Sequence, residues 1–445
     1  MPSSLQQALQ KIEKPASKKP SKEAAAKPSD AAGEPSNHHQ QQTIHKQSIG
    51  VIKKHAPDYA YREAYSFCSK SECDERQELG QVSILESTVE SCRLPQHSRI
   101  LDPRLAVSKF RRSAAGTVVQ GKSKQELEAC LEHVLEVLCR QAATPMHPPT
   151  SLYITAEFLI DRMRALQSDA TRISANVPVR PIWHLQFARG LIILQYLLQG
   201  HKNFELILRK TCMMMITTAL NDFWASFDYH HGKSDHPREL HALQDEILTY
   251  MSLIHLSNCI LDDSNRNSPS GVLHHFQKHA SSSSGKENYP SWTMALECAA
   301  LLSRQEYGLL LQCVDKLLPR SMVLGRCCLA LALQPLRYHA ISQYNSSFAK
   351  NEAVSDLDQL LICDTIKIQK ECESYGLPVE SDNESSKTIV RMKAAPMAEY
   401  NKKSPPSRED AWVFFGMPVT FPRTDEDGIS LPSPEWLQYV IFGQR

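Results

Sequence analysis

The chain has 445 residues, of which 42% are hydrophobic and 22% are charged, and its formal net charge is +1. This composition is that of a globular protein of roughly two or three domains. The near-zero charge excludes a chain-wide basic field for nucleic acid or membranes, so any such surface has to be local. No apolar run approaches the roughly 18 residues of a membrane span, and we expect no membrane insertion.

Thirteen cysteines are scattered along the chain, many of them in apolar runs. This pattern is typical of reduced, buried cysteines in an intracellular protein. The odd count, and an N-terminus without an apolar signal core, argue against a secreted disulfide framework. We therefore expect a nuclear or cytoplasmic protein.

The first segment, residues 1–54, is rich in Lys, Ala, Ser, Pro and Gln and has almost no large apolar side chains. It cannot bury enough surface to offset its chain entropy, so we expect a disordered, mildly basic arm. The lysines at 18–22 and 53–54 have two interpretations, nuclear import signals or a solvated tail. Residues 55–122 are expected to form an extended, partly helical leading segment.

Helical periodicity dominates the middle of the chain. One predicted helical face over 126–138 has apolar residues at i, i+3, i+4, i+7, i+8 and i+11, namely Leu127, Cys130, Leu131, Val134, Leu135 and Leu138. A second stripe runs from Leu152 to Leu166. Further helices are expected near 183–199, 203–227, 238–261, 291–302, 305–317, 321–334 and 337–348. Many helices with short loops predict a mainly α fold, with a helical, solenoid-like domain over 123–350.

The pattern changes over residues 351–395. Two short helices are expected at 355–362 and 365–375, with Asp364 as N-cap and Gly376 as the C′ glycine of the second. A polar turn then leads to a β-branched stretch at 387–393 that predicts a strand. Helix, helix and strand hairpin is the order of a winged-helix subdomain. Residues 396–445 are expected to form an extended tail with a short helix.

Basic side chains gather on the second helix and the hairpin of this subdomain: Lys367, Lys370, Lys387, Arg391 and Lys393. A winged helix usually presents these elements to nucleic acid, where Lys and Arg neutralise phosphates. A solvated charged face explains the same residues, and Glu371 and Glu373 dilute the charge. Nucleic-acid binding by the five residues is therefore one of two open interpretations.

Residues Gly116–Ser123 fit the consensus of a P-loop, whose lysine and serine reach nucleotide phosphates and magnesium. A P-loop must follow a buried strand, but residues 108–115 are basic and small, and no second acidic strand is evident. Ser123 with Glu126 three residues later also forms a helix capping box. We favour the cap and retain a P-loop nucleotidase as a third, weaker hypothesis.

A second motif, Cys68-x4-Cys73 with Cys92 and His97, offers four possible zinc ligands, but its spacing matches no common zinc site. Structural cysteines are the preferred interpretation. No triad or paired-carboxylate arrangement can be argued from the order of residues. We assign no catalytic residue, no metal ligand and no cofactor, and expect a protein that is not an enzyme.

Several segments, taken in order over about 65–395, resemble the Sac-three/GANP family. They are Phe67–Arg76 with Ser83–Glu86, the Arg-Ser-Ala-Ala-Gly step at 112–116, the helix Phe158–Asp169, and Tyr375–Val379 with Thr388–Arg391. Asp74 stands where the family has Pro, and Gln167 where it usually has Arg. The motif residues carried over as structural are Cys68, Cys73, Glu75, Arg76, Arg112, Gly116, Asp161, Arg162, Arg164 and Asp169.

The resemblance implies a PCI-type helical domain that ends in a winged helix. It implies pairing with a PCI-domain partner, often with a small acidic DSS-type protein, and RNA binding by the joint surface. The first hypothesis is thus a non-enzymatic adaptor in nuclear messenger-RNA export or processing, in a TREX-two-like complex with possible association with the nuclear pore.

The chain also lacks the Phe-Gly repeats and the long C-terminal scaffold helix of the large members of that family. It therefore resembles the short members, some of which are linked to the centrosome and spindle. The second hypothesis is a regulatory protein of the centrosome and spindle with little direct RNA contact, located in the cytoplasm and at the centrosome.

Overall fold

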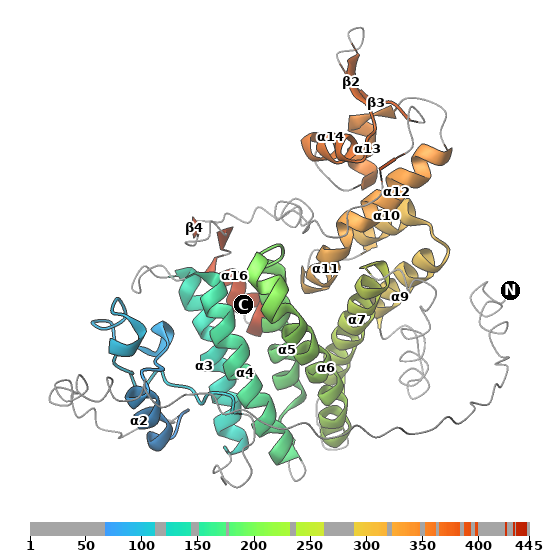
Figure 1. Ribbon diagram of the computed structural model, residues 1–445. Coiled ribbons are helices and arrows are strands. Elements are labelled where there is room, and N and C mark those ends of the chain that lie inside the picture. The colour runs from blue at the N-terminus through green and yellow to red at the C-terminus, as the bar shows by residue number, and fades with distance from the viewer. Residues whose placement is uncertain are drawn as a thin grey trace, which may run out of the picture. The chain divides into compact units, whose positions relative to one another are not determined.

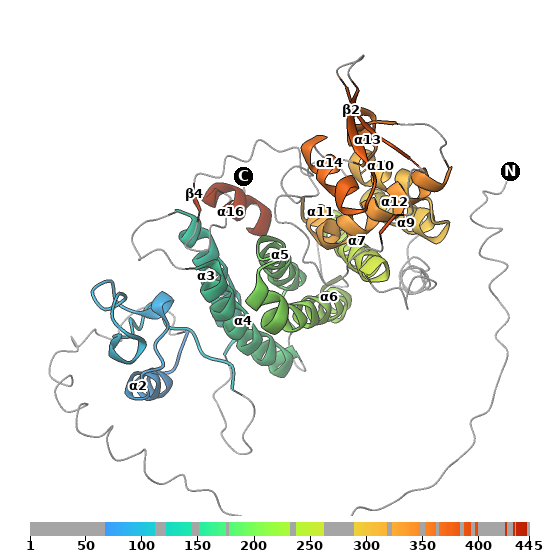
Figure 2. The same cartoon turned by 45° about the horizontal axis from the view of Figure 1, so that its top comes forward.

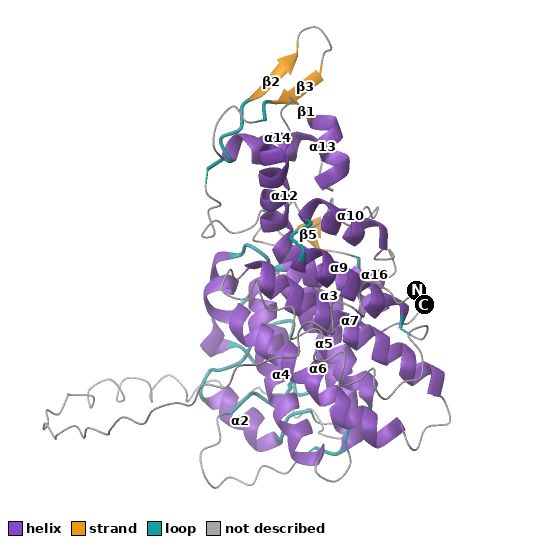
Figure 3. Cartoon of the chain, turned by 90° about the vertical axis from the view of Figure 1, so that its right-hand side faces the viewer, coloured by secondary structure: helices purple, strands orange, loops and turns teal. Residues whose placement is uncertain are grey.

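The computed structural model describes residues 67–111, 122–143, 151–174, 178–231, 237–261, 289–317, 323–347, 352–361, 365–382, 387–392, 397–398, 423–424, 430–431 and 433–442. The chain divides into two units, Met1–Asp58 and Tyr59–Arg445, and every described residue belongs to the second. The basic arm predicted over 1–54 therefore lies outside the described residues. Those residues are mainly helical, as predicted (Figure 1, Figure 3).

The leading segment contains helix α2, Lys70–Glu78, and two 3-10 turns, η2 (Ile84–Glu86) and η3 (Gln96–Ser98). Ser69 caps α2, because its Oγ accepts a hydrogen bond from the backbone N–H of Glu72 at 3.2 Å. A small apolar cluster holds the segment together: Cys68, Cys73, Val82, Leu101 and Ala106. Residues 67–111 therefore form a mostly irregular structure around one short helix.

The first five long helices are α3 (Lys124–Ala143), α4 (Leu152–Ser174), α5 (Pro181–Leu197), α6 (Arg209–His231) and α7 (Pro237–Leu261). Helix α3 packs on α4, α5 on α6 and α6 on α7 (Figure 2). The apolar stripe predicted for α3 is buried, as expected for an amphipathic helix that faces a core. The capping box at the start of α3 is also confirmed: the Ser123 N–H donates to Glu126 Oε2 at 2.6 Å, and the Glu126 N–H to Ser123 Oγ at 3.3 Å.

A π-helical turn, η4 (Phe204–Leu208), precedes α6, so the single helix predicted over 203–227 is two elements. Helices α9 (Pro290–Ser303), α10 (Tyr307–Leu317), α11 (Val323–Leu329) and α12 (Leu333–Ser347) follow. The break predicted between residues 334 and 337 is wrong, since the 3-10 turn η7 (Ala330–Ala332) separates α11 from α12. Pro335 lies within the first turn of α12, where the missing N–H costs no helical hydrogen bond.

The next elements, which we call the terminal unit, are β1 (Glu352–Ala353), α13 (Val354–Leu361), α14 (Thr365–Ser374), β2 (Val379–Asp382) and β3 (Lys387–Val390). The strands form an antiparallel sheet in the order β1-β3-β2. Both predicted helices and the strand are present within a few residues of their expected bounds. The predicted N-cap, Asp364, lies outside the described residues.

Helix α14 ends at Ser374, and Gly376 is its C′ glycine, as predicted from the sequence. This glycine has φ = +77°, a conformation that other residues adopt with strain. Its N–H donates to the Glu373 carbonyl at 3.0 Å, and the Leu377 N–H donates to the Cys372 carbonyl at 2.9 Å. These two bonds are the Schellman motif, and the buried side chains of Leu377 and Cys372 supply its apolar contact.

The predicted C-terminal helix is present as α16, Pro434–Phe442, after a small antiparallel pair of β4 (Arg423–Thr424) and β5 (Ser430–Leu431). It packs on α3 and α5, with Leu437 and Ile441 fully buried (Figure 1, Figure 2). One cluster of buried apolar side chains extends from α3 through the terminal unit to α16. Within the described residues, no helix has both the length and the apolarity to cross a membrane.

Candidate functional site

Three of the sequence motifs meet at a buried carboxylate, that of Glu86. Arg76 of α2 donates to Glu86 Oε2. Arg162 of α4 donates from Nη2 to Glu86 Oε2 at 2.8 Å and from Nε to Glu86 Oε1 at 3.2 Å. The side chains of Arg76, Glu86 and Arg162 are 2%, 0% and 5% exposed, and we call them the buried ionic cluster.

The backbone of Val107 completes the cluster. Its N–H donates to Glu86 Oε1 at 2.9 Å, and its carbonyl accepts from Arg76 Nη1 at 3.2 Å. Burial alone would lower the pKa of Arg76, but the adjacent Glu86 carboxylate outweighs it and raises that pKa. Arg76 therefore stays protonated, and the hydrogen bonds of Glu86 to Arg162 tie the leading segment to α4.

Further contacts surround the cluster where the motifs reach solvent. Glu72 Oε1 accepts the Lys109 N–H at 2.7 Å, and Arg111 pairs with Glu75 at 2.7 Å. The Arg164 guanidinium lies 4.1 Å from the centre of the Phe110 ring, a cation–π contact.

Asp161 pairs with Arg162 and accepts the Phe110 N–H at 3.4 Å, so it lies beside the buried ionic cluster. Two of the predicted motif residues, Arg112 and Gly116, lie outside the described residues. Of the others, Glu75, Arg76, Asp161 and Arg164 have contacts that join α2, the 105–111 segment and α4.

Lys122, the lysine of the P-loop match, lies beside Asp169. Its Nζ is 3.3 Å from Asp169 Oδ2 and donates to Ser108 Oγ at 3.1 Å. The described part of the preceding chain, 102–111, contains no strand, and every strand pair in the described residues is antiparallel. A P-loop depends on a parallel sheet, so these contacts favour the helix-cap interpretation.

The structure does not bring three or more of the four candidate zinc ligands together. Cys68 and Cys73 pack in the small apolar cluster of the leading segment, and Cys92 donates to the Val89 carbonyl at 3.1 Å. A hydrogen bond with Cys73 and burial raise the pKa of the Cys68 thiol. Among the described residues, no group of three or more His, Cys, Asp or Glu side chains has a metal-binding arrangement.

The predicted nucleic-acid residues all lie in or next to the terminal unit, but they differ in their surroundings. Lys370 is exposed on α14, one helical turn after Lys367. Lys387 begins β3. Arg391, directly after β3, forms an ion pair with Glu380 of β2, with the two side chains 51% and 44% exposed. Lys393 lies outside the described residues.

A buried arginine fastens the terminal unit to the preceding helix. Arg337 of α12 has no exposed surface; its Nε donates to the Leu361 carbonyl of α13 at 3.0 Å. Its Nη1 lies 3.5 Å from Glu371 Oε1 of α14. Glu371, which appeared in the sequence to dilute the basic charge of α14, is thus directed inward and has a structural contact.

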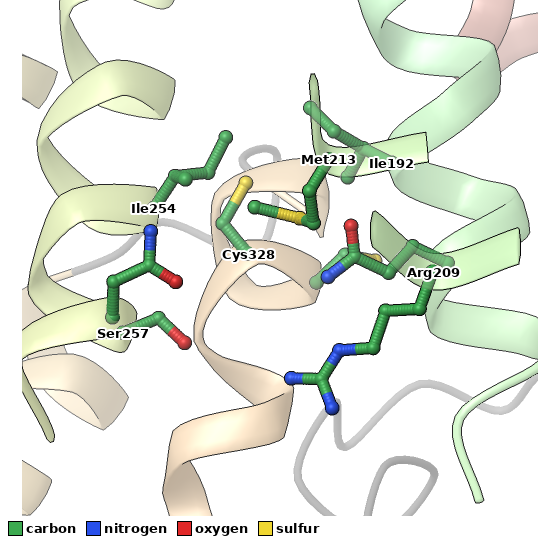
Figure 4. A pocket seen from close by; sticks show the side chains of 9 residues that line it. Ile192, Arg209, Met213, Ile254, Ser257 and Cys328 are labelled. Carbon is green, nitrogen blue, oxygen red and sulfur yellow. The ribbon is translucent and has the colours of Figure 1, made fainter. Parts of the chain in front are cut away.

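One pocket lies between α5, α6, α7 and α11 (Figure 4). Its lining mixes apolar side chains with a few polar ones: Ile192, Gln195, Arg209, Met213, Ile254, Ser257, Asn258, Cys327 and Cys328. The guanidinium of Arg209 is already paired with Glu205 at 2.7 Å. The pocket therefore presents no uncompensated charge, and we assign it no ligand.

The model of the SAC3/GANP family matches residues 67–381, which is most of the chain. This region begins at α2, contains the buried ionic cluster and ends within β2. No curated protein sequence matches the chain.

Proposed function

The chain belongs to the SAC3/GANP family, and we propose that it is a non-enzymatic adaptor of nuclear messenger-RNA export or processing. Membership suggests a scaffold role in a protein complex of messenger-RNA export. The finer proposal is that residues 123–350 are a PCI-type domain and residues 351–395 a winged helix that contacts RNA. It also includes pairing with a PCI-domain partner and residence in the nucleus.

The observation that carries the RNA proposal is the arrangement of the terminal unit. Two short helices are followed by a hairpin that extends a three-stranded antiparallel sheet. Lys370 lies exposed on the second helix, and Lys387 begins the last strand. Lysine contributes affinity for RNA mainly by neutralising phosphates, which does not depend on base sequence.

Glu380 refines the proposed contact set. Because its carboxylate pairs with Arg391, that guanidinium is already partly neutralised in the free protein. Lys370 and Lys387 are therefore the primary proposed contacts. Arg391 would contribute only after it exchanges a carboxylate partner for a phosphate.

The test is single-stranded RNA binding by the full chain, measured over a series of salt concentrations. The slope of log K against log salt is negative, and each lost phosphate contact reduces its magnitude by about 0.7, so Lys370→Ala with Lys387→Ala should reduce the magnitude by about 1.4. Glu380→Ala should have the opposite effect and strengthen binding, since it releases Arg391.

The matched control is Lys210→Ala, which removes an exposed lysine from α6. It should leave the slope unchanged if binding is local to the terminal unit. An equal loss of slope in the control and the double variant would mean that RNA meets a diffuse positive charge. No change in the double variant would remove both lysines from the proposed site.

A second surface, on η4 and the start of α6, is the proposed binding site for the small acidic partner. Leu206, Ile207 and Met214 are 74%, 61% and 56% exposed on η4 and the start of α6. Lys202 and Lys210 lie exposed on the same stretch, whereas Glu205 is neutralised by Arg209. Apolar side chains flanked by uncompensated cations complement a segment that alternates apolar and acidic residues.

The partner proposal is tested with a purified small acidic DSS-type protein. Leu206→Lys with Ile207→Lys should abolish its binding to the full chain, measured by calorimetry or pull-down. Leu309→Lys is the matched control, because Leu309 is 54% exposed but lies on α10. Equal binding by all variants would exclude the η4–α6 surface. Affinity purification with mass spectrometry then asks whether a PCI-domain protein co-purifies.

A further inference from the structure

Two buried thiols from consecutive helices are in contact. All twelve cysteines in the described residues are buried, and none of them forms a disulfide. Among them, Cys298 of α9 and Cys313 of α10 have their Sγ atoms 3.5 Å apart, within hydrogen-bond distance. A disulfide needs a separation of about 2.05 Å, so the two sulfurs have to approach by about 1.5 Å to form one.

The turn between the two helices holds this pair in place. Arg304, Gln305 and Glu306 connect α9 to α10, and each backbone N–H donates to a carbonyl in the last turns of α9. Gln305 has φ = +59°, and its carbonyl accepts a hydrogen bond from the Gln343 side chain of α12. The contact of Cys298 with Cys313 is therefore part of a fixed helical hairpin.

The two thiols differ in reactivity. The hydrogen bond between the two thiols lowers the pKa of Cys313, whereas the same bond and burial raise the pKa of Cys298. Cys313 is also the more accessible of the two, at 7% exposed against 0%. Because the thiolate is the form that reacts with peroxide, Cys313 is the one expected to be oxidised first.

We propose that Cys298 and Cys313 are a redox pair that forms a reversible disulfide within the folded chain. Hydrogen peroxide oxidises the Cys313 thiol to a sulfenic acid and is reduced to one water. The Cys298 sulfur then attacks the Cys313 sulfur, and the hydroxyl leaves as a second water after taking the Cys298 proton. Two thiols thus lose two electrons and two protons, and one peroxide becomes two waters.

The disulfide would affect the helices on which the terminal unit packs. Helix α10 packs on α9, α12 and α13. A covalent link between α9 and α10 restricts the motion of the helices on which α13 rests. This inference is independent of the RNA and partner proposals, since it needs only the apposed thiols.

The experiment treats the reduced, native full chain with hydrogen peroxide, blocks the remaining thiols and digests it without reductant. Mass spectrometry should find the Cys298–Cys313 linked peptide as the predominant intramolecular disulfide, and dithiothreitol should remove it. In Cys298→Ser, a dimedone adduct should accumulate on Cys313, because the resolving thiol is absent. Cys212→Ser is the matched control, because Cys212 is equally buried but bonds to the Leu191 carbonyl, and it should leave the linked peptide unchanged.

Thermal melting supplies a second measurement on the wild-type chain, which needs no variant to fold. Oxidation should raise the melting temperature, and reductant should return it to the starting value. Failure to detect the linked peptide in native protein while other cysteines are modified would overturn the proposal. A linked peptide that forms only in denaturant would also overturn it, because the native contact would then be irrelevant.

Discussion

Glu86 lies in the three-residue turn η2, but it is the centre of the buried ionic cluster. Its carboxylate compensates two guanidiniums and accepts a backbone N–H, all with almost no exposed surface. Glu86→Gln keeps the shape but removes the carboxylate charge that compensates buried Arg76, and it leaves Arg162 with Asp161 alone. Removing one member of a buried ion pair costs about 3–5 kcal/mol, and we expect a loss of unfolding free energy of that size.

Denaturant unfolding of the full chain measures this loss. The matched control is Glu75→Gln, which breaks the neighbouring Arg111–Glu75 pair, where both side chains are about half exposed. Exposed pairs contribute about 1 kcal/mol or less, so the control should unfold close to the wild type. Equal stability of the two variants would contradict a central role for Glu86.

At the scale of elements, the features predicted best were those set by neighbours in sequence. The cap of α3 and the glycine that ends α14 each depend on residues within one turn, so local rules suffice. The π-helical turn η4, the 3-10 turn η7 and the two-residue strand β1 were not predicted. They are short, and the helical period of apolar residues does not distinguish them.

The candidate sites were predictable to different extents for a related reason. The order of motifs correctly indicated the family, but not that Glu86 is the centre of the cluster, since 76 positions separate it from Arg162. Likewise, the sequence placed Lys370, Lys387 and Arg391 in one unit but could not foresee the partner of Arg391. The inward direction of Glu371 depends on Arg337, an α12 residue 34 positions earlier. Contacts between distant segments follow from tertiary packing, which a single sequence leaves open.

At the scale of the whole described chain, α16 brings the C-terminal part back to the first long helices. Leu437, Val440 and Ile441 are buried against α3 and α5, in the core cluster that also contains the terminal unit. Arg189 of α5 donates to the Ile441 carbonyl at 3.1 Å and pairs with Glu246 of α7 at 2.8 Å. Helix α16 has nine residues, and so short a helix is not stable alone in water, so its structure depends on this packing.

This dependence predicts that a substitution in α16 changes the stability of the helices on which it packs, α3 and α5. Ile441→Ala removes three buried carbons and should lower the free energy of unfolding by about 2–5 kcal/mol, the usual cost of such a cavity. The control is Tyr439→Ala, since Tyr439 is 44% exposed on the same helix, and a surface change of this kind stays within about 0.5 kcal/mol. Denaturant unfolding, followed by far-UV circular dichroism and by tryptophan fluorescence, measures both variants. Because α16 shares one core with α3 and α5, the unfolding transitions reported by the two probes should shift together in Ile441→Ala. A shift confined to one probe, or no shift, would mean that α16 folds apart from the body.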